Sequence, residues 1–172
     1  MDRTTSGAAD GGLTRTRVQR AALAVGIVFL LVGIAGFIPG VTSDFSDLSF
    51  AGHESDAKLL GIFQVSILHN IVHLLFGAVA VAAARRWSTS RSYLIWAGVI
   101  YVVLWVYGLV IDKESTANIV PVNNADNWLH LVLGLGMIAL GLVLGRQHVQ
   151  AVGHDDTVAG RGGARGGARG VR

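Results

Sequence analysis

The sequence predicts an all-α fold: an integral membrane four-helix bundle of two parallel-oriented helical hairpins, with the N and C termini in the cytoplasm. Three observations lead to this prediction. Hydrophobic residues make up 52% of the 172 residues and charged residues only 15%, whereas soluble domains average about 25% charged residues. Four apolar stretches are long enough to cross a bilayer. The basic residues gather at alternate ends of these stretches, as they do in multi-pass membrane proteins.

The four predicted spans follow one another between residues 18 and 146. A hydrocarbon core of about 30 Å requires roughly 20 helical residues. The first stretch stops at Pro39-Gly40, a pair that terminates helices, and charged residues bound the C-terminal ends of the other three. The predicted spans are residues 21–38, 65–84, 93–111 and 127–145.

The basic residues define the orientation. Only two of the 14 Lys and Arg residues, Lys58 and Lys113, fall in the loops after the first and third spans. All the others are arginines in the two tails and in the loop between the second and third spans. Under the positive-inside rule the arginine side is cytoplasmic, which predicts a multi-pass protein of the cell membrane. A cleaved signal peptide is disfavoured for the first stretch because its apolar run is long and no clear A-x-A site follows.

The two tails differ from the spans in composition. Residues 1–17 are polar, and residues 147–172 end in a short Gly/Arg repeat. Both are predicted to be disordered cytoplasmic tails, because neither can bury enough apolar surface to fold. The arginines at this side are expected to contact anionic lipid headgroups. We interpret the Gly/Arg segment as a solvated tail and expect no specific nucleic-acid partner.

The most specific pattern occurs twice, in the second and fourth spans. Asn70-Ile-Val-His73-Leu-Leu-Phe-Gly77 and Asn127-Trp-Leu-His130-Leu-Val-Leu-Gly134 both read N-x-x-H-L-x-x-G, at an offset of 57 residues. The pattern indicates an internal repeat in which each hairpin is one unit. The first and third spans show no clear match, so the repeat is a hypothesis at this point.

The spacing of the motif places its polar residues and glycines on one helical face. Polar groups inside a bilayer are costly unless they are paired, so these faces are predicted to meet in the bundle centre. Glycine would let the helix backbones approach closely. The predicted site residues are His69, Asn70, His73, Asn127 and His130, and the predicted helix-packing residues are Gly77, Gly134, Gly141 and Gly145.

Three functions fit this polar centre. We favour a structural or accessory membrane protein with an interhelical hydrogen-bond network, because such polar side chains commonly join membrane helices. Alternatively, His69 and His73 could chelate a metal, or His73 and His130 could bind haem axially. A third interpretation is a small proton-linked transporter or sensor. Because four helices enclose little volume, a transporter would require a homo-oligomer.

Enzymatic motifs are missing from the sequence. It contains no phosphate-binding glycine loop, no H-E-x-x-H pair and no G-x-S-x-G elbow. It also contains no cysteine, which rules out disulfides, thiolate metal ligands and thiol catalysis. No conventional enzyme is indicated.

Two runs resemble a known family. Residues 59–77, which end in His69-Asn-Ile-Val-His73-Leu-Leu-Phe-Gly77, and residues 120–131 resemble the bacterial membrane family called domain of unknown function 4383. The resemblance covers roughly residues 20–145 and implies a four-helix membrane protein. It marks His69, Asn70, His73, Asn127 and His130 as signature positions. The family implies no activity, substrate or cofactor.

Overall fold

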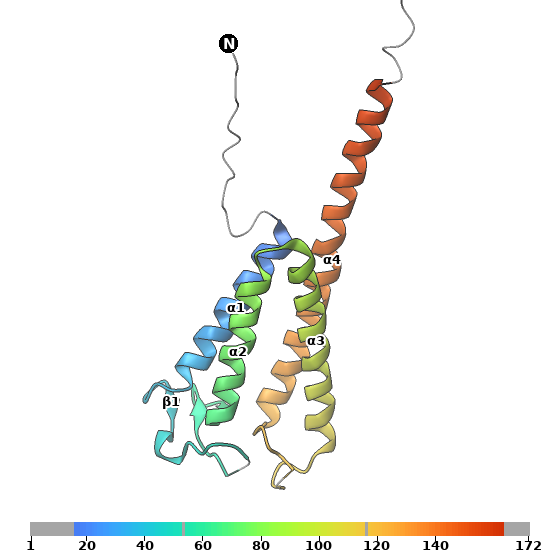
Figure 1. Ribbon diagram of the computed structural model, residues 1–172. Helices are drawn as coiled ribbons and strands as arrows, with labels where there is room; N and C mark the ends of the chain where they lie inside the picture. The colour runs from blue at the N-terminus through green and yellow to red at the C-terminus, as the bar shows by residue number, and fades with distance from the viewer. Residues whose placement is uncertain (1–15, 53, 116, 164–172) are drawn as a thin grey trace, which may run out of the picture.

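The computed structural model describes residues 16–52, 54–115 and 117–163, with side chains as far as Arg146. Within these residues the chain forms four helices that run side by side (Figure 1). The helices are α1 (Arg17–Ala35), α2 (Ile67–Ala83), α3 (Trp87–Val110) and α4 (Asn124–Gly163). Residues 1–15 and 164–172 lie outside the described residues, so the predicted disorder there stays a prediction.

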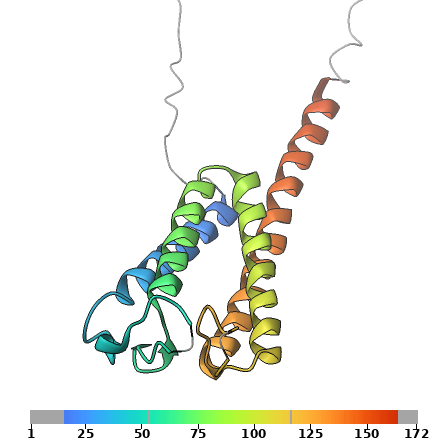
Figure 2. The same ribbon diagram turned by 60° about the horizontal axis from the view of Figure 1, so that its bottom comes forward.

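The helices pair into two hairpins, α1 with α2 and α3 with α4. The contacts within each hairpin are far more extensive than those between hairpins. Figure 2 shows the two pairs side by side, with the short connection between α2 and α3 at one end. The helical, two-hairpin architecture predicted from the sequence is thus confirmed.

Three of the helices are long and apolar enough to cross a membrane: α1, α3 and residues Asn124–Arg146 of α4. The fourth, α2, is apolar but has 17 residues, a length of about 25 Å at 1.5 Å per residue. It is shorter than the predicted span of residues 65–84 because its first turn starts only after the Ser66 cap. Conversely, α4 continues to Gly163, past the predicted end at 145 and into the segment assigned to a disordered tail.

Short polar side chains start three of the helices. Thr16 begins α1 with a capping box, in which its hydroxyl accepts from the Gln19 N–H and the Gln19 side chain accepts from the Thr16 N–H. Ser66 Oγ accepts from the His69 N–H at the start of α2. Asn123 Oδ1 accepts from the Asp126 N–H at the start of α4. These caps satisfy N–H groups that have no partner within the helix.

The connection between α1 and α2 contains a small sheet that the sequence did not predict. Its strands are β1 (Thr42–Ser43), β2 (Lys58–Leu59) and β3 (Phe63–Gln64), paired antiparallel in the order β1-β2-β3. A 3-10 turn, η1 (Phe45–Asp47), follows β1. The sheet covers its own apolar core of Ala57, Leu59 and Val65, which packs against the end of α1.

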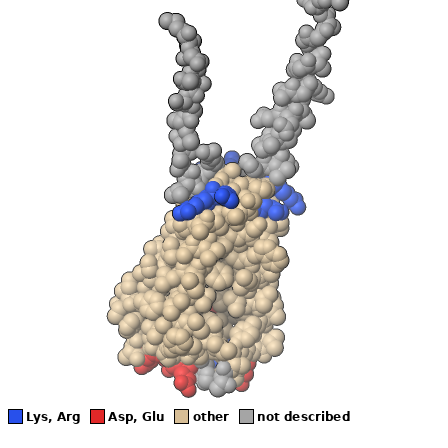
Figure 3. All heavy atoms as spheres, viewed as in Figure 1, with Lys and Arg blue, Asp and Glu red and all other residues tan. Residues whose placement is uncertain are grey.

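Charged residues separate to opposite ends of the bundle (Figure 3). We call the end at the start of α1 and the α2–α3 connection the arginine end, and the end with the sheet the acidic end. The described arginines lie at the former, because they are at the start of α1, in and just after the α2–α3 connection, and next to Gly145, which Arg91 covers: Arg17, Arg20, Arg85, Arg86, Arg91 and Arg146. On the face shown in Figure 3 almost no charged residue lies between the two ends, and the exposed side chains of the helices are mainly large and apolar. This is the surface that a bilayer requires.

Candidate functional site

Five rings from all four helices meet in the half of the bundle nearer the acidic end. We call them the central cluster: Phe29 of α1, His69 and His73 of α2, Tyr101 of α3 and His130 of α4. Each is at most 9% exposed. The sequence singled out the three histidines for this position, but it did not single out Phe29 or Tyr101.

Tyr101 is the centre of this cluster because it contacts residues of both hairpins. Its ring stacks on Phe29 with centroids 5.4 Å apart and planes 12° apart, and it meets His130 edge to face at 5.1 Å. Its hydroxyl oxygen lies 3.4 Å from His73 Nε2. One side chain of α3 therefore contacts the other three helices.

His73 is oriented by hydrogen bonds at both ring nitrogens. Its Nδ1 lies 3.1 Å from the carbonyl oxygen of His69, and a carbonyl can only accept, so Nδ1 carries the hydrogen. In the neutral ring Nε2 then holds the lone pair, and the Tyr101 hydroxyl donates to it. The His69 ring stacks on the His73 ring at 4.5 Å with the planes 3° apart, which further restricts its rotation.

The two motif asparagines pack within their own hairpins. Asn70 covers Gly36 at the end of α1, and Asn127 covers Gly108 in the last turns of α3. A Cβ atom added at either glycine would overlap the side-chain amide of its asparagine. Since Asn70 and Asn127 are 1% and 3% exposed, each fills a space that the neighbouring glycine leaves open.

The motif glycines also mark the closest backbone contacts of each hairpin. A Cβ atom on Gly77 would lie 2.9 Å from the carbonyl oxygen of Gly26, and one on Gly134 would lie 2.9 Å from that of Gly98. Both distances are too short for a carbon–oxygen contact, so only glycine fits without moving the partner helix. The other two predicted packing glycines, Gly141 and Gly145, face α3, where Ile95 and Arg91 cover them.

The sequence predicted an interhelical hydrogen-bond network of Asn70, His73, Asn127 and His130, but in the described structure no hydrogen bond joins the side chains of the two motifs. The only side-chain hydrogen bond between helices in the cluster is that of His73 with Tyr101. Among the described residues, both amide atoms of Asn70, Asn127 Oδ1, His69 Nδ1 and His130 Nδ1 are buried without a hydrogen-bond partner. The reason is geometric: the asparagines face their own glycines, and the Tyr101 ring lies against His130 while its hydroxyl reaches His73.

The segment between α1 and α2 closes the acidic end over this cluster. Asp126 Oδ2, in the first turn of α4, accepts from the Gln64 N–H of β3 at 2.9 Å and from the Asn123 N–H at 3.0 Å. The Asn123 side chain donates to the Ile62 carbonyl at 2.7 Å, and the Gly52 N–H donates to the Ile119 carbonyl at 2.8 Å. These hydrogen bonds fasten the sheet of the first hairpin onto the second.

The histidines are poorly arranged for a metal or haem. The parallel stacking of His69 on His73 does not point two ring nitrogens at one ion. Both nitrogens of His73 already form hydrogen bonds, which ligation would have to break. Within the described residues no three metal-ligating side chains lie close enough together to hold an ion.

Residues that sequence reasoning missed form a second correspondence, between α1 and α3. At an offset of 72 residues, Gly26, Phe29 and Gly36 correspond to Gly98, Tyr101 and Gly108, and each pair makes equivalent contacts. The sequence signal is a glycine followed by an aromatic residue at i+3 and a second glycine at i+10. It was hidden because its offset differs from the 57 residues that relate α2 to α4.

The comparisons with known proteins gave one match. A family model described as "Domain of unknown function (DUF4383)" matches residues 19–143. The matched segment contains the central cluster, both motif asparagines and the sheet. No curated protein and no solved structure matches the chain significantly.

Proposed function

The chain belongs to the DUF4383 family, whose model covers its helical bundle, and from that starting point we propose that it is a cell-membrane protein with a structural or accessory role. In this role the central cluster joins two helical hairpins into one rigid bundle. The protein acts through its lipid and protein neighbours and carries out no reaction of its own.

The contact that best supports this role is that of Tyr101 with both hairpins. Contacts between the hairpins are far fewer than contacts within them, and the Tyr101 stack on Phe29 and its hydrogen bond to His73 join the two hairpins inside the bundle. A second tyrosine of α3 supports it: the Tyr93 hydroxyl donates to the Phe76 carbonyl of α2 at 2.9 Å. A hydrogen bond between membrane helices contributes about 0.6 kcal/mol on average and up to about 1.7.

A double-mutant cycle of His73→Phe and Tyr101→Phe tests this role. Both changes keep a ring and remove the hydrogen bond, and we expect a coupling free energy of about 0.6 to 1.7 kcal/mol. Tyr107→Phe is the control, because its hydroxyl donates to the Ala117 carbonyl in the loop after α3 and, among the described residues, joins no two helices. The free energies come from unfolding in mixed detergent micelles. Zero coupling would mean that the two side chains do not join the hairpins.

The other functional interpretations make separate predictions. A Soret band or stoichiometric metal that disappears in His73→Ala and His130→Ala would replace the structural role by a cofactor-binding one. Proteoliposome flux that disappears in the same variants would replace it by transport. The structure favours neither, because the helix core between the cluster and the arginine end is packed mainly with apolar side chains. These are Val18, Ala22, Ala84, Leu94, Ala97 and Met137.

We further propose that all four helices cross the membrane with the arginine end in the cytoplasm. The separation of charges in Figure 3 supports this orientation. The chain has no cysteine, so single cysteines can report it directly. Ser46→Cys lies exposed at the acidic end and Ser88→Cys lies exposed at the arginine end. A membrane-impermeant maleimide should label the first in intact cells and the second only after permeabilisation; the reverse pattern contradicts the orientation.

The two hairpins, in this proposal, are copies of one unit that arose by duplication. The five buried residues of α2 correspond one to one, at an offset of 57, to buried residues of α4. These pairs are His69 with Asp126, Asn70 with Asn127, His73 with His130, Gly77 with Gly134 and Ala80 with Met137. The helix caps Ser66 and Asn123 obey the same offset. Phe29 and Tyr101, which correspond between α1 and α3, stack on each other, as residues beside a two-fold axis would.

A further inference from the structure

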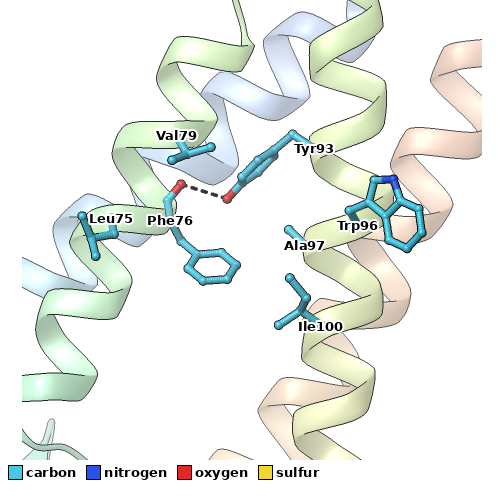
Figure 4. A pocket seen from close by; sticks show the side chains of 7 residues that line it. All are labelled: Leu75, Phe76, Val79, Tyr93, Trp96, Ala97 and Ile100. Carbon is cyan, nitrogen blue, oxygen red and sulfur yellow. Dashed lines mark hydrogen bonds between the residues drawn. The ribbon is translucent and has the colours of Figure 1, made fainter.

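A groove runs along the surface between α2 and α3, on the arginine-end side of the central cluster (Figure 4). Its deeper part has a volume of about 300 Å³. It is lined by Leu75, Phe76 and Val79 of α2 and by Tyr93, Trp96 and Ile100 of α3. A second hollow shares Val79, Tyr93 and Trp96 with it and continues to Thr89 and Ser92, so the two form one groove.

The wall of the groove is apolar along the length that would lie in the bilayer. The Tyr93 hydroxyl is the only side-chain hydroxyl lining the deeper part, and it donates to the Phe76 carbonyl across the groove. Leu75, Val79 and Trp96 are 60%, 57% and 66% exposed. Inside a bilayer such a surface is compatible with a hydrocarbon occupant, because it presents few polar groups.

The mouth of the groove lies at the arginine end. Thr89 and Ser92, in the first turns of α3, line this part. They directly follow the α2–α3 connection, which carries Arg85 and Arg86, both exposed. No acidic residue is present in the first turn of α3. An anionic group at this mouth would therefore meet two guanidinium groups, which bind phosphate well.

The length of the groove matches one leaflet of a bilayer. Thr89 and Ile100, at its two ends, are 11 residues apart on α3, or roughly 16 Å along the helix axis. Half of a hydrocarbon core is roughly 15 Å. An acyl chain that begins at the arginine end would therefore lie in the groove as far as the bilayer midplane.

We propose that the groove between α2 and α3 binds one acyl chain of an anionic phospholipid, whose phosphate is bound by Arg85 and Arg86. This inference goes beyond the structural role proposed above and shares with it only the insertion of the chain in a membrane. The groove has arginines at one end and an apolar wall along the rest, which matches the charged headgroup and the acyl chain of a phospholipid. The helix of a second copy would match the apolar wall but would not need the arginines.

Native mass spectrometry of the full chain tests this binding. The protein is reconstituted in vesicles of equal parts phosphatidylglycerol and phosphatidylcholine with the same acyl chains, extracted in mild detergent and analysed for retained lipid. We expect one retained phosphatidylglycerol per chain, in preference to phosphatidylcholine. A direct hydrogen bond to a charged group changes binding roughly tenfold or more, so Arg85→Gln with Arg86→Gln should lower the preference by more than tenfold.

Two controls separate the site from general attraction. Arg20→Gln with Arg146→Gln removes the same charge from the same end, at exposed positions on α1 and α4 and not on the α2–α3 connection, and should keep the preference. Val79→Phe fills the groove from an exposed position and should release the lipid, whereas Val143→Phe, 56% exposed on α4, should not. Helicity by circular dichroism confirms that each variant is folded.

Three results would overturn the proposal. Equal loss of preference in both arginine pairs would show diffuse electrostatic attraction without a site. Retention of phosphatidylglycerol by Val79→Phe would place the lipid elsewhere. A dimer that dissociates in Val79→Phe, together with no lipid preference in the unsubstituted chain, would identify a second copy as the occupant of the groove.

Discussion

The close backbone contact at Gly134 is open to a stringent test, because α4 carries a matched glycine two residues away. A Cβ atom on Gly134 would lie 2.9 Å from the Gly98 carbonyl oxygen and 3.0 Å from the Val102 nitrogen. A Cβ atom on Gly136 would meet nothing within 4 Å. Gly134→Ala and Gly136→Ala are therefore the same chemical change on the same helix, and only one of them faces a neighbour.

The comparison isolates packing from helix propensity. Alanine is favoured over glycine in a helix by about 1 kcal/mol, but this gain is common to both variants and cancels in their difference. Ordinary contacts at these atoms lie beyond 3.4 Å, so α3 and α4 must separate by several tenths of an ångström in Gly134→Ala. Overpacking of this kind costs about 1 to 3 kcal/mol, which is the difference in unfolding free energy that we expect between the two variants.

Thermal unfolding in detergent, followed by circular dichroism at 222 nm, is a suitable assay. For a chain of this size, 1 kcal/mol corresponds to roughly 2 to 4 °C in Tm, so Gly134→Ala should melt about 2 to 12 °C below Gly136→Ala. The first hairpin offers a repetition: Gly77→Ala should also be destabilised, because its Cβ atom would lie 2.9 Å from the Gly26 carbonyl oxygen. Equal Tm values for the two α4 variants would refute the close backbone approach.

Two further predictions concern the acidic end. Asn123→Ala should lower the unfolding free energy by about 1 kcal/mol or more, because it removes the cap of α4 and the hydrogen bond to the Ile62 carbonyl. Asn124→Ala, at an exposed neighbouring position, should leave the unfolding free energy nearly unchanged. Equal effects of the two substitutions would contradict the capping role. Leu60→Gly should raise stability slightly, by up to about 1 kcal/mol, because Leu60 adopts a φ of 55° in the β2–β3 turn. A loss of stability in Leu60→Gly would indicate that its side chain contributes more than the strain costs.

The sequence predicted best those features that depend on position along the chain alone, namely the helix positions and the buried helix faces. Bilayer thickness sets the length of apolar runs, and the arginines mark one end of each, so every helix end except the C-terminal end of α4 was placed to within six residues. The N-x-x-H-L-x-x-G spacing likewise predicted which faces of α2 and α4 are buried: Asn70, His73, Asn127 and His130 are all at most 9% exposed. Period and burial are linked by helix geometry alone.

The partners of these residues could not be predicted, because they depend on how the hairpins sit together. Tyr101 looked like one more aromatic residue in an apolar span, and nothing in its spacing indicates that it would contact both His73 and His130. The two asparagines were expected to join the histidines in an interhelical hydrogen-bond network, yet each covers a glycine on the preceding helix. The sheet was missed because its strands have only two residues each, too few to show a period-2 pattern.

The difference between the two offsets explains why the two hairpins of the proposed duplication are not equivalent. Because the offset falls from 72 residues between α1 and α3 to 57 between α2 and α4, the loop of the first hairpin is 15 residues longer than that of the second. That longer loop holds β1, β2 and β3, and it reaches across to the second hairpin. There Asp126, at the position that corresponds to His69, accepts the backbone N–H of Gln64.

An extra segment in the first copy would thus account for two differences between the hairpins: the attachment of the sheet and the residue before the motif asparagine. In the first hairpin the position before the motif asparagine carries His69, whose ring stacks on His73 inside the cluster. In the second it carries Asp126, whose carboxylate is turned toward the sheet and away from the Tyr101–His130 contact. The sheet of the first hairpin packs onto the start of α4 in the second hairpin. Only α4 therefore needs a hydrogen-bond acceptor at this position. Exchange of the two residues, His69→Asp with Asp126→His, should therefore weaken the attachment of the sheet and disturb the central cluster together.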